Sequence, residues 1–170
     1  MKYFFDTEFI EDGKTIDLMS IGIVREDGAA YYAESIECDL GRANPWVKEN
    51  VIAHLLRGPT FRSRAKIKQE ILDFVGQDKP EFWAYYADYD WVVLCQLFGT
   101  MMDLPKGWPM YCRDIKQWCD ALGNPKLPEQ IGMEHHALSD AWHNKKQWEF
   151  LAALEAGRKW KKTSAWRYYF

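Results

Sequence analysis

Two acids interrupt an apolar stretch at the start of the chain. Residues 2–10 read K-Y-F-F-D-T-E-F-I, in which the aromatic residues predict a buried strand and Asp6 and Glu8 stand two positions apart. In a strand, side chains at positions i and i+2 point to the same face. The two carboxylates would therefore lie side by side and repel each other. Either this end of the strand is open to water, or a cation lies between the two acids.

Length and composition predict one globular domain. The chain has 170 residues, of which 48% are hydrophobic, which is enough for a sizeable core and argues against disorder. Its apolar runs are too short to span a bilayer, so no membrane partner is expected. Met1 leads directly into the strand-like segment, so no signal peptide is expected. The four cysteines form no C-x-x-C pair, which favours free thiols in a reducing cytoplasm.

The charge is unevenly distributed. The formal net charge is −3, but the segment from Arg158 onward, R-K-W-K-K-T-S-A-W-R-Y-Y-F, carries five basic residues and no acid. The preceding 157 residues therefore hold 17 basic and 25 acidic residues, a net of −8. A protein segment with this much net negative charge is not expected to bind duplex nucleic acid non-specifically. Binding to nucleic acid would have to be local and assisted by metal ions.

The order of the expected elements predicts an α/β fold. Three consecutive strands with short connections suggest an antiparallel meander, and the alternation of helix and strand that follows suggests a mixed sheet with helices packed on it. Strands are expected at 2–9, 15–25, 29–35, 81–86 and 110–113, and helices at 46–56, 62–75, 89–98, 114–122 and 137–154.

Two further acids stand at informative places. Asp90 lies at the junction of the apolar segment A-Y-Y-A with the following helix, and Asp140 lies near the start of the last long helix. Each has an ordinary explanation. Asp88 or Asp90 could cap a helix N-terminus, where an acid is favourable, and Asp140 could be a solvated helix residue. The pair Asp6 and Glu8 is harder to explain in this way because its neighbours are so apolar.

Taken together, these acids resemble the signature of the DEDDh 3′–5′ exonucleases. The first segment, D-x-E, matches D-T-E at 6–8, the second matches Asp90, and the third, H-x-A-x-x-D, matches H-H-A-L-S-D at 135–140. The resemblance covers residues 2–154 in the family's order and is greatest to short single-domain bacterial exoribonucleases. It implies a ribonuclease-H-like fold with a mixed five-stranded sheet. The implied exonuclease domain is 1–155, followed by a basic aromatic tail at 156–170.

The chain departs from the family pattern at three places. Phe9 follows the D-x-E segment, where many relatives carry a small or polar residue. Asp88 lies close to Asp90, and the family register favours Asp90. Two histidines are adjacent: His135 fits the spacing of the histidine branch, whereas His136 fits the spacing that a sister branch fills with tyrosine. His135 is preferred as the base.

The resemblance implies two-metal hydrolysis of phosphodiesters. Four converging carboxylates need cations, and hard oxygen ligands suit Mg²⁺ or Mn²⁺, two ions about 4 Å apart. Asp6 would bridge the ions, Glu8 and Asp140 would complete one site, and Asp90 would act mainly through water at the other. His135 would be the general base, because histidine ordinarily titrates nearest to neutral pH.

The implied substrate is single-stranded RNA or a 3′ overhang, from whose 3′-hydroxyl end nucleoside 5′-monophosphates are released. Phe9, Leu18 and Met19 are candidates for stacking on the terminal base, and core packing is the alternative, especially for Leu18. Trp160 and Trp166, among the basic residues of the tail, could form a strand-tracking arm, a dimer contact or a frayed end. The aromatic surplus and the resemblance also favour a homodimer.

Other functions stay open at this point. A DNA-directed exonuclease of the same family would carry the same acids, because no residue that senses a 2′-hydroxyl can be identified. A non-catalytic nucleic-acid-binding module on this fold is a second alternative, although all five expected groups are present. A zinc site made of His135, His136, His143 and a cysteine is a third, but adjacent histidines rarely share one metal.

Overall fold

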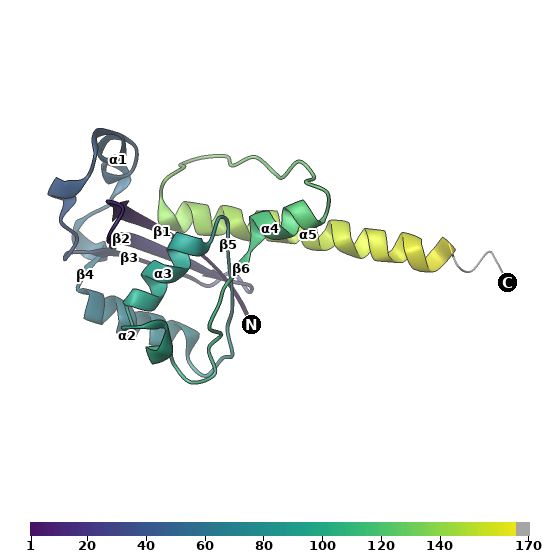
Figure 1. Ribbon diagram of the computed structural model, residues 1–170, viewed down its shortest axis with the longest axis horizontal. Coiled ribbons are helices and arrows are strands. Elements are labelled where there is room, and N and C mark those ends of the chain that lie inside the picture. The colour runs from purple at the N-terminus through teal and green to yellow at the C-terminus, as the bar shows by residue number, and fades with distance from the viewer. Residues whose placement is uncertain (166–170) are drawn as a thin grey trace.

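A six-stranded mixed sheet forms the centre of the molecule (Figure 1). The computed structural model describes the backbone of residues 1–165 and the side chains of residues 1–158. The expected α/β fold is confirmed. In this part of the chain the strand order is β4-β3-β2-β1-β5-β6, with bounds Lys2–Glu11 (β1), Ile16–Arg25 (β2), Ala30–Ser35 (β3), Phe61–Arg62 (β4), Glu81–Ala84 (β5) and Arg113–Asp114 (β6).

The first three strands form the expected antiparallel meander, whereas β4, β5 and β6 run parallel to their neighbours. The expected number of five strands is corrected to six, because Phe61–Arg62 adds a two-residue strand beside Glu34 and Ser35. The strand expected at 110–113 is also corrected, since its pairing with β5 begins at Arg113. Two-residue pairings carry no periodicity by which a sequence could predict them.

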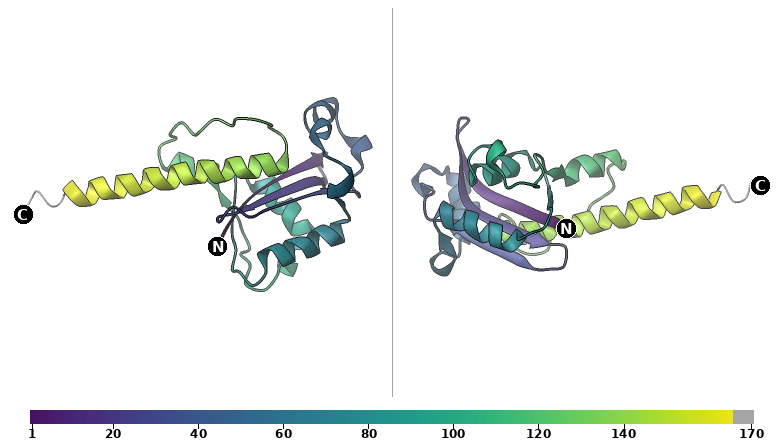
Figure 2. Two further views of the ribbon diagram at one scale, coloured as in Figure 1. Left: turned by 180° about the vertical axis from the view of Figure 1, so that it is seen from behind. Right: turned by 90° about the horizontal axis from the view of Figure 1, so that it is seen from below.

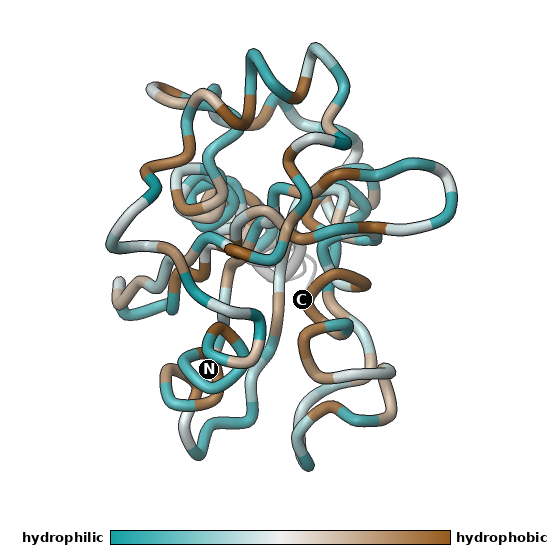
Figure 3. Tube along the Cα trace, turned by 90° about the vertical axis from the view of Figure 1, so that its left-hand side faces the viewer, coloured by the Kyte–Doolittle hydropathy of each residue, from teal (hydrophilic) through white to brown (hydrophobic). Residues whose placement is uncertain are grey.

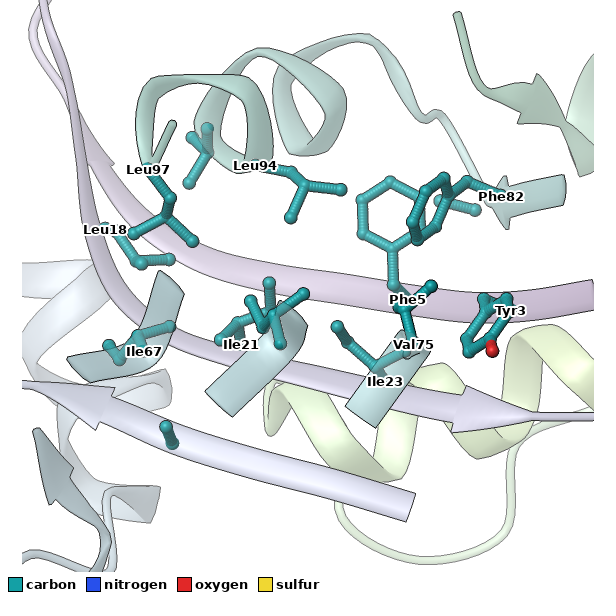
Figure 4. Packing of buried hydrophobic residues seen from close by; sticks show 14 of the residues in the cluster. Tyr3, Phe5, Leu18, Ile21, Ile23, Ile67, Val75, Phe82, Leu94 and Leu97 are labelled. Carbon is teal, nitrogen blue, oxygen red and sulfur yellow. The ribbon is translucent and has the colours of Figure 1, made fainter. Parts of the chain in front are cut away.

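Helices cover both faces of the sheet (Figure 2). Helices α2 (Arg64–Val75) and α3 (Asp88–Gln96) pack on one face, and α4 (Ile115–Ala121) and α5 (Ala137–Ala165) pack on the other. Side chains alternate along β1 between the two layers: Tyr3 and Phe5 join the cluster with α2 and α3, shown in Figure 4, and Phe4 joins the cluster with α4 and α5. Burial on both faces explains why this strand reads as a continuous apolar run.

The helix expected at 46–56 is shorter in the structure. Helix α1 spans Pro45–Asn50, and Asn44 caps it by accepting a hydrogen bond from the Val47 amide at 2.9 Å. A 3₁₀ turn at Ile52–His54 follows. The intervening Val51 is buried in a cluster with residues of β1 and β2, so tertiary packing overrides continuation of the helix.

Helix α5 projects beyond the body of the molecule (Figure 1). Its described part spans Ala137–Ala165 and thus extends beyond residue 154, the expected end. The predicted roles of the side chains of Trp160 and Trp166 lie outside the described residues. Hydrophobic and hydrophilic residues intermix along the helices (Figure 3). Within the described chain, none of the helices combines the length and the apolar character that crossing a membrane requires.

Candidate active site

Three carboxylates from distant parts of the sequence lie together. Asp6 and Glu8 belong to β1, and Asp140 lies in the first turn of α5. Their side chains offer oxygens that all lie within 4.8 Å of one another. The two-residue spacing in β1 thus places Asp6 and Glu8 together, as the strand pattern predicts. Among the described residues, this is the one group of three or more acidic, histidine or cysteine side chains with such spacing.

Asp90 approaches the same part of β1 from α3. Its Oδ1 accepts hydrogen bonds from the backbone N–H of Thr7 at 2.8 Å and from the Thr7 hydroxyl at 2.6 Å, and the residue is 6% exposed. Thr7 stands between Asp6 and Glu8, so the four predicted acids gather around three consecutive residues of β1. Asp88, the alternative in this segment, is exposed to solvent.

The acids gather where β1 loses a neighbouring strand. β5 pairs with β1 over Lys2 to Phe4. Beyond Phe4, side chains of the two flanking helices bond to the backbone of β1 instead: Asp90 accepts from the Thr7 amide, and Asn144 of α5 donates to the Phe5 carbonyl at 2.9 Å. The strand therefore changes from aromatic to acidic residues where helix side chains, rather than a neighbouring strand, bond to its backbone.

A glycine on β2 lets α5 approach closely enough for Asp140 to join the site. Gly22 pairs with Asp6 on β1. A Cβ atom at Gly22 would lie 2.4 Å from the backbone of Ala137 and Leu138. Ala137 itself is fully buried. The first turn of α5 thus packs directly on the backbone of β2 at the residue that pairs with Asp6.

Burial is the main cause of raised pKa values throughout the cluster. It raises the pKa of Asp6 far above its ordinary value, and the nearby Asp90, Glu8 and Asp140 raise it further. Burial followed by repulsion from Asp140 and Asp90 raises the pKa of Glu8 to about 8. The pKa of Asp90 rises to about 6, since burial outweighs its hydrogen bonds to Thr7. Burial also raises the pKa of Asp140, against a hydrogen bond from Gln130.

This donor set fits a divalent cation. In the part of the chain that the structure describes, no lysine, arginine or histidine forms an ion pair with Asp6, Glu8, Asp90 or Asp140. Four acids without a protein cation are costly when they are ionised. Carboxylate oxygens are the ligands that Mg²⁺ and Mn²⁺ prefer, and a bound cation would favour the ionised form of each acid.

The two adjacent histidines have different surroundings. His135 lines a cavity of about 320 Å³ together with Asp6 and Asp140. His136 precedes the first residue of α5, and its Nδ1 accepts a hydrogen bond from the Ser139 amide at 3.4 Å. His136 therefore caps the helix, while His135 faces the acids. His143 also lines this cavity, but no zinc-type cluster of histidine and cysteine occurs among the described residues.

The predicted base-stacking residues differ in accessibility. Leu18 is 3% exposed and Met19 is 1% exposed, and each packs in a hydrophobic cluster, so neither side chain offers a surface to a base. Phe9 is partly exposed and stacks on the ring of Tyr89, with centroids 5.8 Å apart and planes 12° apart. Tyr89 is 51% exposed. The Phe9–Tyr89 pair is therefore a partly exposed aromatic surface that begins one residue after the D-T-E segment.

Sequence reasoning missed several residues around the acids. Asn144, four positions after Asp140 on α5, could have been found from the helical period, since i and i+4 share a face. Gln130, which donates to an Asp140 oxygen, lies in an irregular segment without such a signal. Trp46 of α1 packs edge-on against the His135 ring at 5.0 Å, a contact that no local pattern predicts.

A second cavity is larger than the acidic one. A groove of about 660 Å³ is lined by aromatic residues of β5, α4 and α5, and it includes Trp83, Trp118 and Trp148. None of the four acids lines it. The convergence of Asp6, Glu8 and Asp140, rather than cavity size, marks the candidate active site.

Comparisons with known proteins show the family to which the chain belongs. The family described as the 3′–5′ exoribonuclease Rv2179c-like domain matches residues 1–152. The chain is 42% identical over 164 residues to the 3′–5′ exoribonuclease Rv2179c of Mycobacterium tuberculosis strain H37Rv, covering 93% of this chain and 98% of the relative. The same values hold for the 3′–5′ exoribonuclease MT2234.1 of M. tuberculosis strain CDC 1551. On this evidence the chain belongs to the Rv2179c-like 3′–5′ exoribonuclease domain family.

Proposed function

We propose that this protein is a metal-dependent 3′–5′ exoribonuclease of the DEDDh type. The observation that carries the proposal is the convergence of Asp6, Glu8 and Asp140 within 4.8 Å, with His135 on the same cavity. The family assignment supports hydrolysis of RNA from the 3′ end. The DEDDh assignment is supported by His135, because the other adjacent histidine is engaged in capping α5.

Each side chain has a role in this proposal. Asp6, Glu8 and Asp140 would hold a divalent cation, and Asp90 would hold a second on its side of β1. When bound, Mg²⁺ or Mn²⁺ supplies Lewis-acid stabilisation of the phosphodiester. His135 takes a proton from the attacking water as general base. The products would be nucleoside 5′-monophosphates released from a single strand or a 3′ overhang.

The Phe9–Tyr89 stack would support the terminal base. Ring stacking of this kind tolerates different bases, since every base has a flat aromatic face. The acidic body makes cations necessary here, because a polyanionic strand could not otherwise approach four carboxylates. We also propose that the protein is cytoplasmic and forms a homodimer. Its chain would divide into an exonuclease domain at 1–155 and a tail at 156–170.

A time course on end-labelled RNA tests the proposal. Strands with a free 3′-hydroxyl should shorten one nucleotide at a time in the presence of Mg²⁺ or Mn²⁺, and strands with a blocked 3′ end should persist. Parallel measurement on a DNA strand of the same sequence shows whether the enzyme prefers ribose or deoxyribose. Complete inertness of the free-ended RNA with either ion would refute the enzymatic function.

Asp90 and Asp88 provide a matched pair of variants on one turn of α3. Asp90→Asn keeps an oxygen that can accept a hydrogen bond from Thr7 but removes the negative charge. We expect kcat to fall by at least about 100-fold, which is more than the loss of an outer-shell partner of a metal site usually costs. Asp88→Asn makes the same change on the exposed side and should leave kcat near that of the wild type. Equal rates for the two variants would exclude the role given to Asp90.

A further inference from the structure

We propose that Tyr32 and His136 form a positioning pair that holds Asp140 and His135 in their working places. Tyr32 lies on β3, and its ring stacks on the imidazole of His136 with centroids 4.7 Å apart and planes 19° apart. This role rests on the proposed function, since it concerns the same site. Neither residue is one of the proposed metal ligands or the proposed base.

His136 is bonded to the first turn of α5 in three ways. Its backbone N–H donates to Asp140 Oδ2 at 3.1 Å, and its carbonyl accepts from the Asp140 amide at 3.0 Å. Its ring Nδ1 accepts from the Ser139 amide at 3.4 Å. A shift of the His136 ring would therefore also move two backbone groups that hold Asp140, because the same residue carries the ring and both of these hydrogen bonds.

Tyr32 is held on its other side by a buried carboxylate. The Tyr32 hydroxyl donates to Glu34 Oε1 at 2.9 Å, and Glu34 is fully buried. The same carboxylate accepts from the Leu56 amide at 2.6 Å and the Arg57 amide at 2.9 Å. Glu34 is thus satisfied by three donors, and it fixes the Tyr32 ring at the correct angle for stacking.

The backbone at His135 shows why such an anchor is needed. His135 has a φ of 58°, in the left-handed region that residues other than glycine rarely adopt. Such a conformation costs about 1–3 kcal/mol and persists where the surroundings hold it. The turn directs His135 toward the acids while His136 faces β3. Stacking on Tyr32 holds the residue next to the strained one, so the strained turn is anchored to the sheet.

Tyr31 offers a matched control on the other face of β3. Tyr31 is also partly buried, and its hydroxyl donates to a glutamate, Glu70, at 3.0 Å, but its ring packs near Phe74 in the opposite layer. Tyr32→Leu and Tyr31→Leu therefore remove the same atoms from the same strand. Comparable losses in Tm are expected, and any difference in activity reports on the site.

The experiment measures three quantities for each variant: Tm, the split between kcat and KM, and the Kd for Mn²⁺ without substrate by calorimetry. Tyr32→Leu should lower kcat by roughly 10- to 100-fold and weaken Mn²⁺ binding by about 10-fold, with KM changed less. Tyr32→Phe keeps the stacking ring but loses the hydrogen bond to Glu34, so both properties should fall between those of the wild type and those of Tyr32→Leu. Tyr31→Leu should match the wild type in kcat and in Mn²⁺ affinity.

A double-variant cycle separates coupling from general damage. His136→Asn keeps a capping acceptor but removes the ring, so it should reproduce the effect of Tyr32→Leu, and the double variant should be little worse than either single one. The positioning role would be overturned if Tyr32→Leu had the kcat and the Mn²⁺ affinity of the wild type. If Tyr32→Leu does not fold, the same result for His136→Asn would overturn it. Asp140→Asn distinguishes this from failure of the proposed site: hydrolysis that survives Asp140→Asn would refute the metal-binding role that the proposed function gives to Asp140.

Discussion

At the scale of single residues, the acids of the candidate site lower the stability of the folded protein. Asp6 and Glu8 replace what could be hydrophobic residues on a strand whose neighbours Phe4 and Phe5 are fully or almost fully buried. The raised pKa of Asp6 and Glu8 shows that the folded protein disfavours their charges when no cation is bound. Such groups are typical of functional sites, where proteins accept a loss of stability for activity.

Asp6→Asn tests this conflict directly. In the presence of EDTA at pH 8, the variant should have a higher Tm than the wild type, because the amide keeps the shape but removes the repulsion on Glu8, Asp90 and Asp140. Each kcal/mol gained shifts Tm by about 2–4 °C in a chain of this size. Hydrolysis should be lost, and the rise in Tm on adding Mn²⁺ should shrink. Differential scanning calorimetry with and without the ion measures both effects.

Glu70→Gln is the matched control for this charge removal. Glu70 accepts from Tyr31 and pairs with Arg62 at 3.1 Å, and these partners lower its pKa. Neutralising it should therefore lower Tm or leave it unchanged, with hydrolysis intact. A fall in Tm for Asp6→Asn as large as that for Glu70→Gln would show that the acids of the site do not repel one another.

At the scale of elements, the contact between β2 and α5 assembles the site. Gly22→Ala would place a Cβ 2.4 Å from the backbone of Ala137 and Leu138, and a backbone cannot turn aside as a side chain can. The first turn of α5 must then move away from β2 and take Asp140 with it. We expect a loss of about 1–3 kcal/mol in the free energy of unfolding and a fall in kcat of about 100-fold or more.

Gly157→Ala supplies the comparison on the same helix. No atom lies within 4 Å of a Cβ built at Gly157, so the substitution should raise stability by roughly 0.5–1 kcal/mol through helix propensity. Urea denaturation and RNA hydrolysis measure both variants. Wild-type kcat in Gly22→Ala would mean that α5 does not need this close approach to place Asp140.

The elements that the sequence predicted well are those with a strong local pattern. The strands β1 to β3 and the acids on β1 follow from the period of two and from turn signals. The short strands β4 and β6 were not located correctly, because their two residues join the sheet through neighbours distant in sequence. The bond between Asp90 and Thr7, and the separate environments of His135 and His136, depend on tertiary packing and carry no local signal.

At the scale of the whole molecule, the cluster joins three elements, so its protonation affects global stability. Without divalent cations, the folded protein holds protons on Glu8 up to about pH 8, whereas the unfolded chain releases them near the ordinary pKa of glutamate. The folded state then binds more protons than the unfolded state, and stability must fall as pH rises through this interval. Burial lowers the pKa values of His136 and His143, so these two residues make stability rise with pH. Their contribution ends at the pH where histidine is neutral in the unfolded chain as well.

We therefore expect Tm in EDTA to fall between about pH 6.5 and pH 8, a window above the ordinary histidine pKa. Saturating Mn²⁺ should remove this fall, because the cation binds the ionised acids, so the increase in Tm that it produces should grow with pH. Asp6→Asn should show a shallower pH dependence in EDTA. Parallel thermal unfolding in EDTA and in Mn²⁺ across this window measures the difference. If the Tm of the wild type in EDTA stayed constant or rose from pH 6.5 to 8, the raised pKa values would be wrong. The argument that these acids need a bound cation to balance their negative charge would then fail as well.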